Sequence, residues 1–446
     1  MSSHSVAPGD RSVPWRDVFP KACRLKPVKY VCSINARSLP ETTDPDTEFR
    51  YVDISNVDSD GNWVSSEPMR FGDAPSRARR VVADGDVLVS TVRTYLRSIA
   101  HIDRVDEPLI CSTGFAVLTA NGAVGSKFLA YWARSVHFVD EVVARSVGVS
   151  YPAVNAPDLG NIPCPVLPID EQRAIGRFLD RETARIDALI EKKRRQIELL
   201  HEKRAALISH AVTKGLDPAA PMKDSRTDWL GPIPAHWLMK RFRFDLTSVE
   251  QGWSPQCDNS LAEPHEWGVL KVGCVNGTEF DESEHKRLPD DLEPRTAYEI
   301  KPGDILMSRA NTTELLGSAV LVRKVRHRLL LCDKLYRMRI DARSLDPEFV
   351  VYAFGSNATR YQFERDATGA SASMKNIGQD TIKGLLMPRP PVDEQRDIVR
   401  VLNAHCERVH QVVAKVRASI ERLREYRAAL ISAAVTGKID VREAIA

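Results

Sequence analysis

The segment that decides the fold spans residues 168–217 and reads PIDEQRAIGRFLDRETARIDALIEKKRRQIELLHEKRAALISHAVTKGLD. It occurs a second time at residues 391–440, which read PVDEQRDIVRVLNAHCERVHQVVAKVRASIERLREYRAALISAAVTGKID. The two copies align without a gap at a constant offset of 223, the difference between Glu394 and Glu171, and about half of their positions are identical. Weaker similarity continues upstream, where residues 84–90 (DGDVLVS) match residues 302–308 (PGDILMS). The chain is therefore an internal duplication in which a variable part and a constant part alternate.

Both constant segments are predicted to be long helices. Each follows a proline with acidic residues, which the helix dipole favours in the first turn. Apolar residues then recur at alternating steps of three and four, the heptad spacing of a coiled coil. We expect the helix seam, and the surface on which partner proteins dock, to be formed by Ile186, Ile190, Ile197, Leu200, Leu207, Val409, Val413, Ile420, Leu423 and Leu430.

Arg204 and Arg427 occupy equivalent positions in this seam. In one interpretation their apolar stems lie along the seam and their heads reach water or a neighbouring glutamate. In the other they fix the register of the two helices.

A continuous helix of about 30 residues would be ~45 Å long, more than one turn of DNA at ~34–36 Å. Two such helices lying antiparallel would relate the two variable parts by an approximate two-fold axis. The helices could then act as a ruler between two binding surfaces.

The variable parts are predicted to be compact domains of mixed secondary structure. Short β-rich runs occur at residues 87–89, 115–118 and 319–322, and one helical stretch follows late in each part, at residues 127–143 and 347–363. The fold class predicted for the chain is α+β, with two α+β domains separated by two long antiparallel coiled-coil helical segments and internal pseudo-two-fold symmetry.

Composition shifts divide the chain into six segments. They are a disordered N-terminus at 1–13, a first variable domain at 14–167, a central helical segment at 168–214, a Pro-rich linker at 215–227, a second variable domain at 228–390 and a C-terminal helical segment at 391–446.

Overall composition limits the possible functions only loosely. The chain has 63 Lys and Arg against 60 Asp and Glu, so a nucleic-acid surface would need local clustering of charge. The eight cysteines show no C-x-x-C pair and no zinc spacing, which favours reduced, structural thiols. The N-terminus lacks the apolar core of a signal peptide, and no stretch approaches the ~18 apolar residues of a membrane span. We therefore expect a cytoplasmic protein with no membrane partner.

Loops that carry Arg, Asn, Gln, Ser and aromatic residues are suited to phosphate and base-edge contacts. For each residue alone a surface or fold-supporting role is the competing interpretation, and Trp63 and Trp267 are expected to be core residues rather than base-stacking ones. The candidate DNA-binding residues are Arg77, Arg79, Arg80, Arg93, Tyr95, Arg97, Ser150, Tyr151, Gln251, Trp253, Arg309, Asn311, Thr312, Thr313, Arg360, Ser371, Ser373 and Lys375.

Motifs for catalysis are missing from the sequence. It contains no G-x-x-x-x-G-K-[ST] phosphate loop, no Asn/Asp-Pro-Pro-Tyr/Phe tetrapeptide, no G-x-S-x-G and no H-E-x-x-H. The acidic cluster of Asp44, Asp46 and Glu48 could suggest a metal-dependent nuclease, but a solvated turn explains it better. We predict a binding protein with no catalytic or metal-binding residues of its own.

The arrangement resembles the specificity (S) subunits of Type I restriction-modification systems. The resemblance rests on the paired PxxEQ motifs at 168–172 and 391–395, the RAALIS motifs at 204–209 and 427–432, and the DWLGPIPAHW entry at 228–237. It implies two target-recognition domains that read a bipartite, asymmetric site in double-stranded DNA. It also implies helices that set the unread gap and dock two methylation (M) subunits, with two restriction (R) subunits joining for cleavage. No cofactor is expected in this chain, because S-adenosylmethionine, ATP and Mg would be bound by the partner subunits.

Two other functions fit parts of the pattern. One is a duplicated coiled-coil adaptor that binds only protein. The other is the DNA reader of a related single-chain restriction-modification enzyme, which the missing motifs argue against.

Overall fold

The computed structural model describes Phe19, Gly61, Trp63 and residues 23–58, 66–369 and 374–441. The predicted N-terminal segment 1–13 and the candidates Ser371 and Ser373 lie outside the described residues. The chain divides into two compact units, unit 1 with residues 1–194 and 417–446 and unit 2 with residues 195–416. The long helices α4 (Ile169–Lys214) and α8 (Val392–Val435) each contribute to both units.

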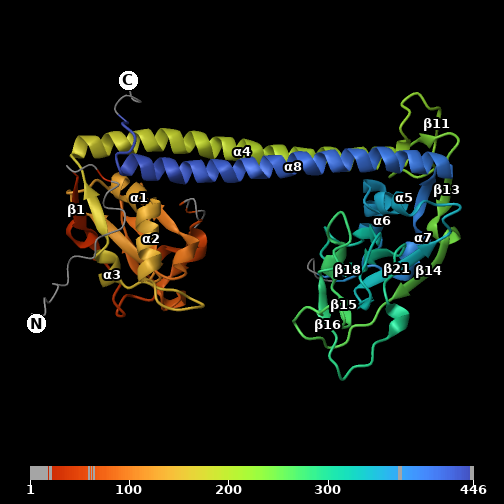
Figure 1. The fold of residues 1–446 in the computed structure, drawn as a ribbon, viewed down its shortest axis with the longest axis horizontal. Coiled ribbons are helices and arrows are strands. Elements are labelled where there is room, and N and C mark those ends of the chain that lie inside the picture. Colours follow the sequence, from red (N-terminus) through yellow and green to blue (C-terminus); the bar gives the residue numbers. More distant parts are fainter. Residues whose placement is uncertain are drawn as a thin grey trace, which may run out of the picture. The chain divides into compact units, whose positions relative to one another are not determined.

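Unit 1, which includes the red and orange strands of Figure 1, contains two four-stranded sheets by its strand pairing. One has the order β2-β9-β6-β7, and the other has the order β4-β3-β8-β5, in which only β3 and β8 run parallel. A separate antiparallel pair joins β1 to β10. The strands are β1 (Arg24–Pro27), β2 (Cys32–Ile34), β3 (Glu48–Val52), β4 (Glu67–Arg70), β5 (Ala78–Val82), β6 (Val87–Ser90), β7 (Ile99–His101), β8 (Leu109–Ser112), β9 (Phe115–Ala120) and β10 (Pro163–Val166).

The sheet that contains β6 is covered on both faces. Val87 and Val89 pack into the same core as Phe128 and Trp132 of the helical layer. Leu88, which points to the opposite face, packs into a second core with residues of β3, β5 and β8. This two-sided burial explains why β6 is a continuous apolar run rather than an alternating one.

The single helical stretches predicted at 127–143 and 347–363 are wrong, because each is two helices. In unit 1 they are α1 (Ser126–Arg134) and α2 (Val136–Arg145), and in unit 2 they are α5 (Pro347–Phe354) and α6 (Asn357–Asp366). The break falls at Ser135 and Ser356, whose hydroxyls accept the backbone N–H groups of Phe138 and Thr359. A serine cap begins a new helix without interrupting the apolar periodicity, so the pattern alone does not reveal the break.

Unit 2 repeats this plan with one four-stranded sheet, one three-stranded sheet and three pairs of strands. Its strand orders are β14-β21-β17-β19, β16-β15-β20, β18-β22, β13-β23 and β11-β12. The predicted linker at 215–227 includes β11, which pairs with β12. The strands are β11 (Met222–Lys223), β12 (Ile233–Pro234), β13 (Leu238–Arg241), β14 (Leu246–Gln251), β15 (Gly268–Leu270), β16 (His285–Arg287), β17 (Ile305–Ser308), β18 (Ala310–Asn311), β19 (Ala319–Leu321), β20 (Leu329–Leu330), β21 (Leu335–Ile340), β22 (Lys375–Asn376) and β23 (Leu386–Arg389), and the short helices are α3 (Ala156–Gly160) of unit 1 and α7 (Gln379–Gly384) of unit 2.

The layering around β17 matches the layering around β6. Ile305 and Met307 share a core with the helices α5 and α6, while Leu306 faces a separate core built on β15 and β20. The duplication seen in the constant segments therefore extends into the variable domains, and the predicted α+β fold class is confirmed.

Segments of the two long helices pack against each other within each unit. In unit 1 Arg427 of α8 binds Asp187 of α4 across the helix pair, with Nε 3.0 Å from the carboxylate Oδ1. The segments run antiparallel, since earlier residues of α4 share a core with later residues of α8. At 46 and 44 residues both helices are longer than the 30-residue estimate. The seam residues Ile186, Ile190, Val409, Val413 and Ile420 are buried, and Ile197, Leu200, Leu207, Leu423 and Leu430 are partly buried.

The guanidinium of Arg427 therefore pairs with a carboxylate of the other long helix, and its role in fixing the register stays a prediction. The equivalent residues in unit 2 are Arg204 and His410, at the same offset of 223 from Arg427 and Asp187. A cation facing a histidine offers no such ion pair, and the Nε of Arg204 is buried without a hydrogen-bond partner. The two halves of the seam therefore differ in their polar chemistry.

Candidate nucleic-acid interface

The glutamine of each PxxEQ motif attaches a variable domain to a long helix. In unit 1 the Gln172 side chain accepts the N–H of Gly125 at 2.8 Å and donates to the carbonyl of Leu167 at 2.7 Å. In unit 2 Gln395 accepts the N–H of Asp346 at 2.8 Å and donates to the carbonyl of Pro390 at 2.9 Å. Both glutamines are buried, and they contact the residues that precede α1 and α5. The repeated motif therefore attaches a variable domain to a long helix in each unit.

The serine of each RAALIS motif provides a second attachment point. The Ser432 hydroxyl of α8 accepts the N–H of Val136, the first residue of α2, at 3.1 Å. The Ser209 hydroxyl of α4 accepts the N–H of Asn357, the first residue of α6, at 2.9 Å. Each variable domain is thus fixed to one long helix by glutamine and to the other by serine. Sequence reasoning missed both roles, although identical polar residues inside an apolar repeat were a usable signal.

Replacing Gln172 by alanine is expected to lower the free energy of unfolding of unit 1 by about 1–3 kcal/mol, because buried backbone groups lose their partners. Urea unfolding followed by tryptophan fluorescence measures the change. Gln196, an exposed glutamine on the same helix, provides the matched alanine control. Equal stabilities for the two variants would contradict the attachment role.

Five of the candidate DNA-binding residues of unit 1 lie together on two neighbouring loops. The loops, residues 91–98 and 146–153, are joined where the N–H of Arg93 donates to the carbonyl of Pro152 at 2.8 Å. The Arg93 guanidinium lies 4.8 Å from the centre of the Tyr151 ring. Tyr95, Arg97 and Ser150 of the same loops are exposed, as are Arg93 and Tyr151 themselves. Cationic and aromatic groups in this arrangement can bind phosphate and stack on bases.

The first of these loops has a strained backbone. Arg93 and Arg97 adopt left-handed conformations with φ of 52° and 55° on either side of the short helix η5 (Thr94–Leu96). Each such residue costs about 1–2 kcal/mol when it is not glycine. The strain is stabilised by packing and by a hydrogen bond of 2.9 Å between the hydroxyls of Thr94 and Ser146. Residues held in this way at a surface are frequently functional.

The equivalent loops of unit 2 are also joined, because β18 pairs with β22. Several candidate side chains there support the loops instead of pointing to solvent. Arg360 donates to the carbonyl of Thr313 at 2.8 Å, and Lys375 donates to the carbonyl of Gly369 at 2.6 Å. The other candidates of this group are Arg309, which donates to the carbonyl of Asp333, Asn311, which donates to Asn276, and the part-buried Thr312.

Other candidates lie away from these loops. Arg77, beside β5, binds Asp53 at 2.6 Å, and Arg79 on β5 stacks on the ring of Phe71 at 4.7 Å. The remaining ones are Arg80, part-buried on β5, Gln251 at the end of β14, and Trp253, which lies under Arg295.

Trp267 and Trp63 were both expected to be core residues. Trp267 packs against a hydrophobic core of unit 2. Trp63 does not, since it is 36% exposed.

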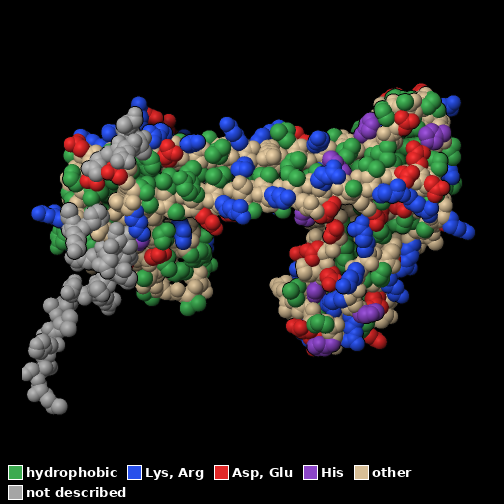
Figure 2. Space-filling model, turned by 45° about the horizontal axis from the view of Figure 1, so that its top comes forward, with side chains coloured by type: hydrophobic (Ala, Val, Ile, Leu, Met, Phe, Trp, Pro, Cys, Tyr) green, Lys and Arg blue, Asp and Glu red, His purple; other side chains and the backbone are tan. Residues whose placement is uncertain are grey.

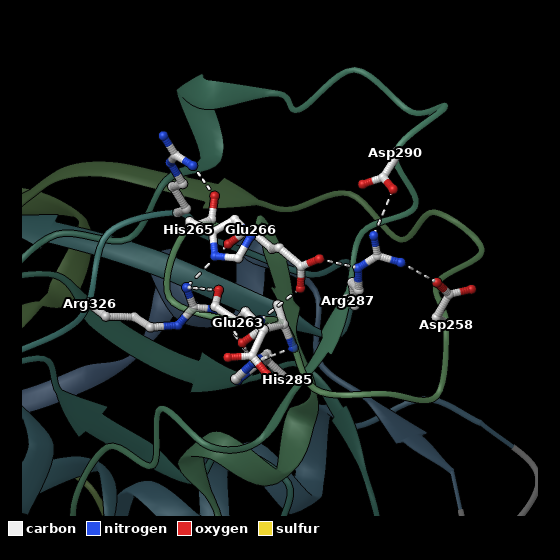
Figure 3. Close-up of polar contacts among 10 residues, drawn as sticks. Asp258, Glu263, His265, Glu266, His285, Arg287, Asp290 and Arg326 are labelled. Atoms are coloured by element: carbon white, nitrogen blue, oxygen red, sulfur yellow. Dashed lines mark hydrogen bonds and ion pairs between the residues drawn. The ribbon is translucent and has the colours of Figure 1, made fainter.

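Unit 2 contains a dense polar cluster around β16 (Figure 3). Arg287 binds Glu266 and Asp290, each at 2.7 Å, and His285 accepts the N–H of Ala262 at 3.1 Å. The pKa of Glu266 lies below its ordinary value because the N–H of Glu263 donates to the carboxylate and Arg287 adjoins it. These charges bind one another, so the cluster fastens the preceding loop to the sheet.

In the acidic cluster near β3, Asp44 accepts the backbone N–H of Asp46 at 3.0 Å, and the other two carboxylates form ion pairs. Asp46 and Glu48 both lie within ion-pair distance of Arg70. Across the described residues, no group of His, Cys, Asp and Glu has the geometry to hold a metal ion. All eight cysteines are free thiols, and burial raises the pKa of Cys32 to about 12.

Charge on the visible surface is mixed rather than segregated. Figure 2 shows Lys and Arg side chains interspersed with Asp and Glu over unit 2, at the right of the view. A DNA-binding surface on such a unit depends on particular loops, because a broad basic face is not present on the side shown. In the part of the chain that the structure describes, no helix combines the length and apolarity needed to cross a bilayer.

Comparisons with known proteins agree with this architecture. Residues 76–199 match the family model described as the Type I restriction modification DNA specificity domain. The specificity subunit of the Type I restriction enzyme EcoEI from Escherichia coli is 27% identical over 208 residues, 46% of this chain and 34% of that protein. The specificity subunit of EcoKI from Escherichia coli K12 is 25% identical over 342 residues, 74% of this chain and 70% of that protein.

A solved structure shares the fold over nearly the whole chain. It comes from a study of complex assembly and conformational transition of the type I R-M system, and it covers 94% of this chain and 99% of its own. The TM-score is 0.69 and the sequence identity is 23%.

Each unit therefore carries a pair of joined loops on the same scaffold, and the loop sequences differ between the two units. By sequence the chain is similar to the specificity subunits of Type I restriction enzymes, and it spans about a third of the EcoEI subunit and 70% of the EcoKI subunit.

Proposed function

We propose that this chain reads a bipartite, asymmetric site in double-stranded DNA, one half with each variable domain. The observation that carries the proposal is the repeated loop pair. The same scaffold presents residues 91–98 and 146–153 in unit 1 and residues around β18 and β22 in unit 2, with different side chains at the tips. Two different surfaces on one repeated frame favour two different half-sites.

We propose that the chain itself catalyses no reaction. Methylation of an adenine amino group in a duplex needs the base to be flipped into a catalytic pocket. We assign that pocket to two methylation subunits that bind S-adenosylmethionine and dock on α4 and α8. Two restriction subunits, with ATP and Mg, would join for cleavage, and the lengths of the long helices would set the unread spacer. The names of the related specificity subunits support this division of labour.

The test is a gel-shift titration of the assembled complex with its methylation subunits. A complex that neutralises 6 to 10 phosphates loses about 10³–10⁵-fold in affinity between 50 and 200 mM salt. We expect such a salt dependence, together with methylation of one adenine in each of two unlike half-sites when the modified bases are mapped across a genome.

The competing function is an adaptor that binds only protein. A complex that assembles with methylation subunits but gives no salt-dependent shift on any duplex would support the adaptor and overturn the proposal.

A further inference from the structure

We propose that the tip of the second loop in unit 1, residues 147–151, is an apolar wedge that enters a groove of the duplex and separates a base step. The inference rests on the proposed function, because it names the part of unit 1 that deforms the DNA. It assigns the stacking role to Tyr151 and the wedge itself to Val149.

The first observation is the exposure of apolar side chains at the tip. Val149 is fully exposed, Val147 is 80% exposed and Tyr151 is 64% exposed. Single exposed apolar residues are normal on a protein surface, but three within five residues form a patch that folding does not require. Such a patch gains stability only when a partner covers it.

The second observation is that the loop is held at its base by hydrogen bonds and a tight turn. Val147 and Ala153 exchange two backbone hydrogen bonds of 2.9 and 3.0 Å, which close the loop at its base. Gly148 has a φ of +116°, and a Cβ there would lie 3.1 Å from the carbonyl oxygen of Tyr151. The tight turn therefore needs glycine. A loop ordered in advance binds without the entropic cost of ordering.

The third observation is the charge beside the tip. The Arg93 guanidinium covers the Tyr151 ring, and Arg97 projects from the neighbouring strained turn. Apolar residues flanked by arginines match a nucleic-acid groove, where cations meet phosphates and apolar side chains insert between base steps. An apolar groove on a protein partner would leave those cations desolvated and unpaired.

The fourth observation is that unit 2 has the same loop base. Thr368 and Asn376 exchange two hydrogen bonds of 2.9 Å, and Gly369 repeats the φ of +116°. The tip between them has a different sequence, residues 370–373 reading ASAS, and lies outside the described residues. A shared base with unlike tips is expected where each half makes its own contact.

The experiment uses the complete complex with its methylation subunits and a duplex that carries the mapped site. Val149→Ser and Tyr151→Ala are compared with Tyr30→Ala, whose ring is 61% exposed and lies under Lys29 in the same unit. We expect both tip variants to bind the specific duplex about 5- to 150-fold more weakly, the range for loss of one stacked base. Binding to an unrelated duplex and binding by the Tyr30 variant should be unchanged.

A second readout follows the wedge itself. 2-Aminopurine placed at each position of both half-sites in turn becomes more fluorescent where a base step is unstacked. Besides the signals expected at the two adenines that the methylation subunits flip, the wild-type complex should brighten at one further step. Val149→Ser should lose that further signal alone at saturating protein. Circular dichroism and retention of the methylation subunits show that the variants are folded and assembled.

Three outcomes would overturn the wedge. If the tip variants bind and brighten as wild type does, the loop does not enter the duplex. If they lose the methylation subunits but keep DNA, the tip is a protein-docking surface. If the wild-type complex shows no salt-dependent binding to any duplex, the proposed function fails first and the wedge fails with it.

Discussion

Replacing Asp245 by alanine is expected to destabilise unit 2 by about 3–5 kcal/mol, because it leaves a buried arginine without its counter-charge. Asp245 and Arg389 are both buried, with Nη2 2.6 Å and Nε 3.0 Å from the same carboxylate oxygen. Burial lowers the pKa of the Arg389 guanidinium, and the Asp245 carboxylate offsets part of that effect. Without the Asp245 carboxylate, the Arg389 guanidinium stays buried but loses the charge that stabilises it.

Unit 1 indicates how this loss can be repaired. The β1–β10 and β13–β23 registers make Val166 the equivalent of Arg389, and the turn after β1 makes Val31 the equivalent of Asp245. Both valines belong to or pack against an apolar core. Asp245→Val combined with Arg389→Val should therefore recover most of the stability lost in Asp245→Ala, since apolar replacement of a buried pair is often neutral. Urea unfolding of the wild type, of Asp245→Ala and of the double valine variant measures these stabilities. A double variant as unstable as Asp245→Ala would show that two valines cannot replace the ion pair in unit 2.

Replacing Ile190 by aspartate is expected to separate the helix pair in unit 1. Ile190 is 4% exposed on the seam, one turn from Asp187, which binds Arg427 of α8. An unpaired charge buried at this site costs several kcal/mol, about 3–5 by analogy with broken buried pairs. We expect faster hydrogen exchange over the α8 segment of unit 1 and, on the proposed function, weaker retention of the methylation subunits.

The neighbouring residue provides the control. Leu189 is 41% exposed on the same helix, so Leu189→Asp adds the same charge outside the seam. Its exchange rates should stay near those of the wild type. If the α8 segment is equally protected from hydrogen exchange in the Ile190→Asp and Leu189→Asp variants, the seam does not hold the helix pair together.

The sequence predicted the parts of the molecule that depend on periodicity and repetition. The heptad spacing in two aligned segments correctly indicated α4 and α8, and the runs at 87–89 and 115–118 correspond to β6 and β9. The unit 1 loops could also be found, because Arg93, Tyr95, Arg97, Ser150 and Tyr151 were selected and lie together. Patterns of this kind are local, and local spacing decides which face of a helix or strand is buried.

The side-chain contacts of the loops around β18 and β22 in unit 2 could not be predicted in the same way. Arginine is a residue type that often binds phosphate, yet the guanidinium of Arg360 donates a hydrogen bond to the carbonyl of Thr313. A side chain's partner across 47 residues of chain depends on how the loops pack, and sequence spacing does not encode that. The breaks at Ser135 and Ser356 were missed for a related reason, because a cap leaves the apolar pattern intact.

By itself the sequence determined that this protein is a duplication of one frame, with two stiff helices of matching period and two unlike domains. Only the tertiary structure decided how each frame is joined. Gln172 and Gln395 bind the turns before α1 and α5, Ser432 and Ser209 bind the starts of α2 and α6, and Arg427 finds Asp187. The physical reason is that apolar periodicity sets burial without direction, whereas a hydrogen bond needs one donor and one acceptor at a single distance and angle.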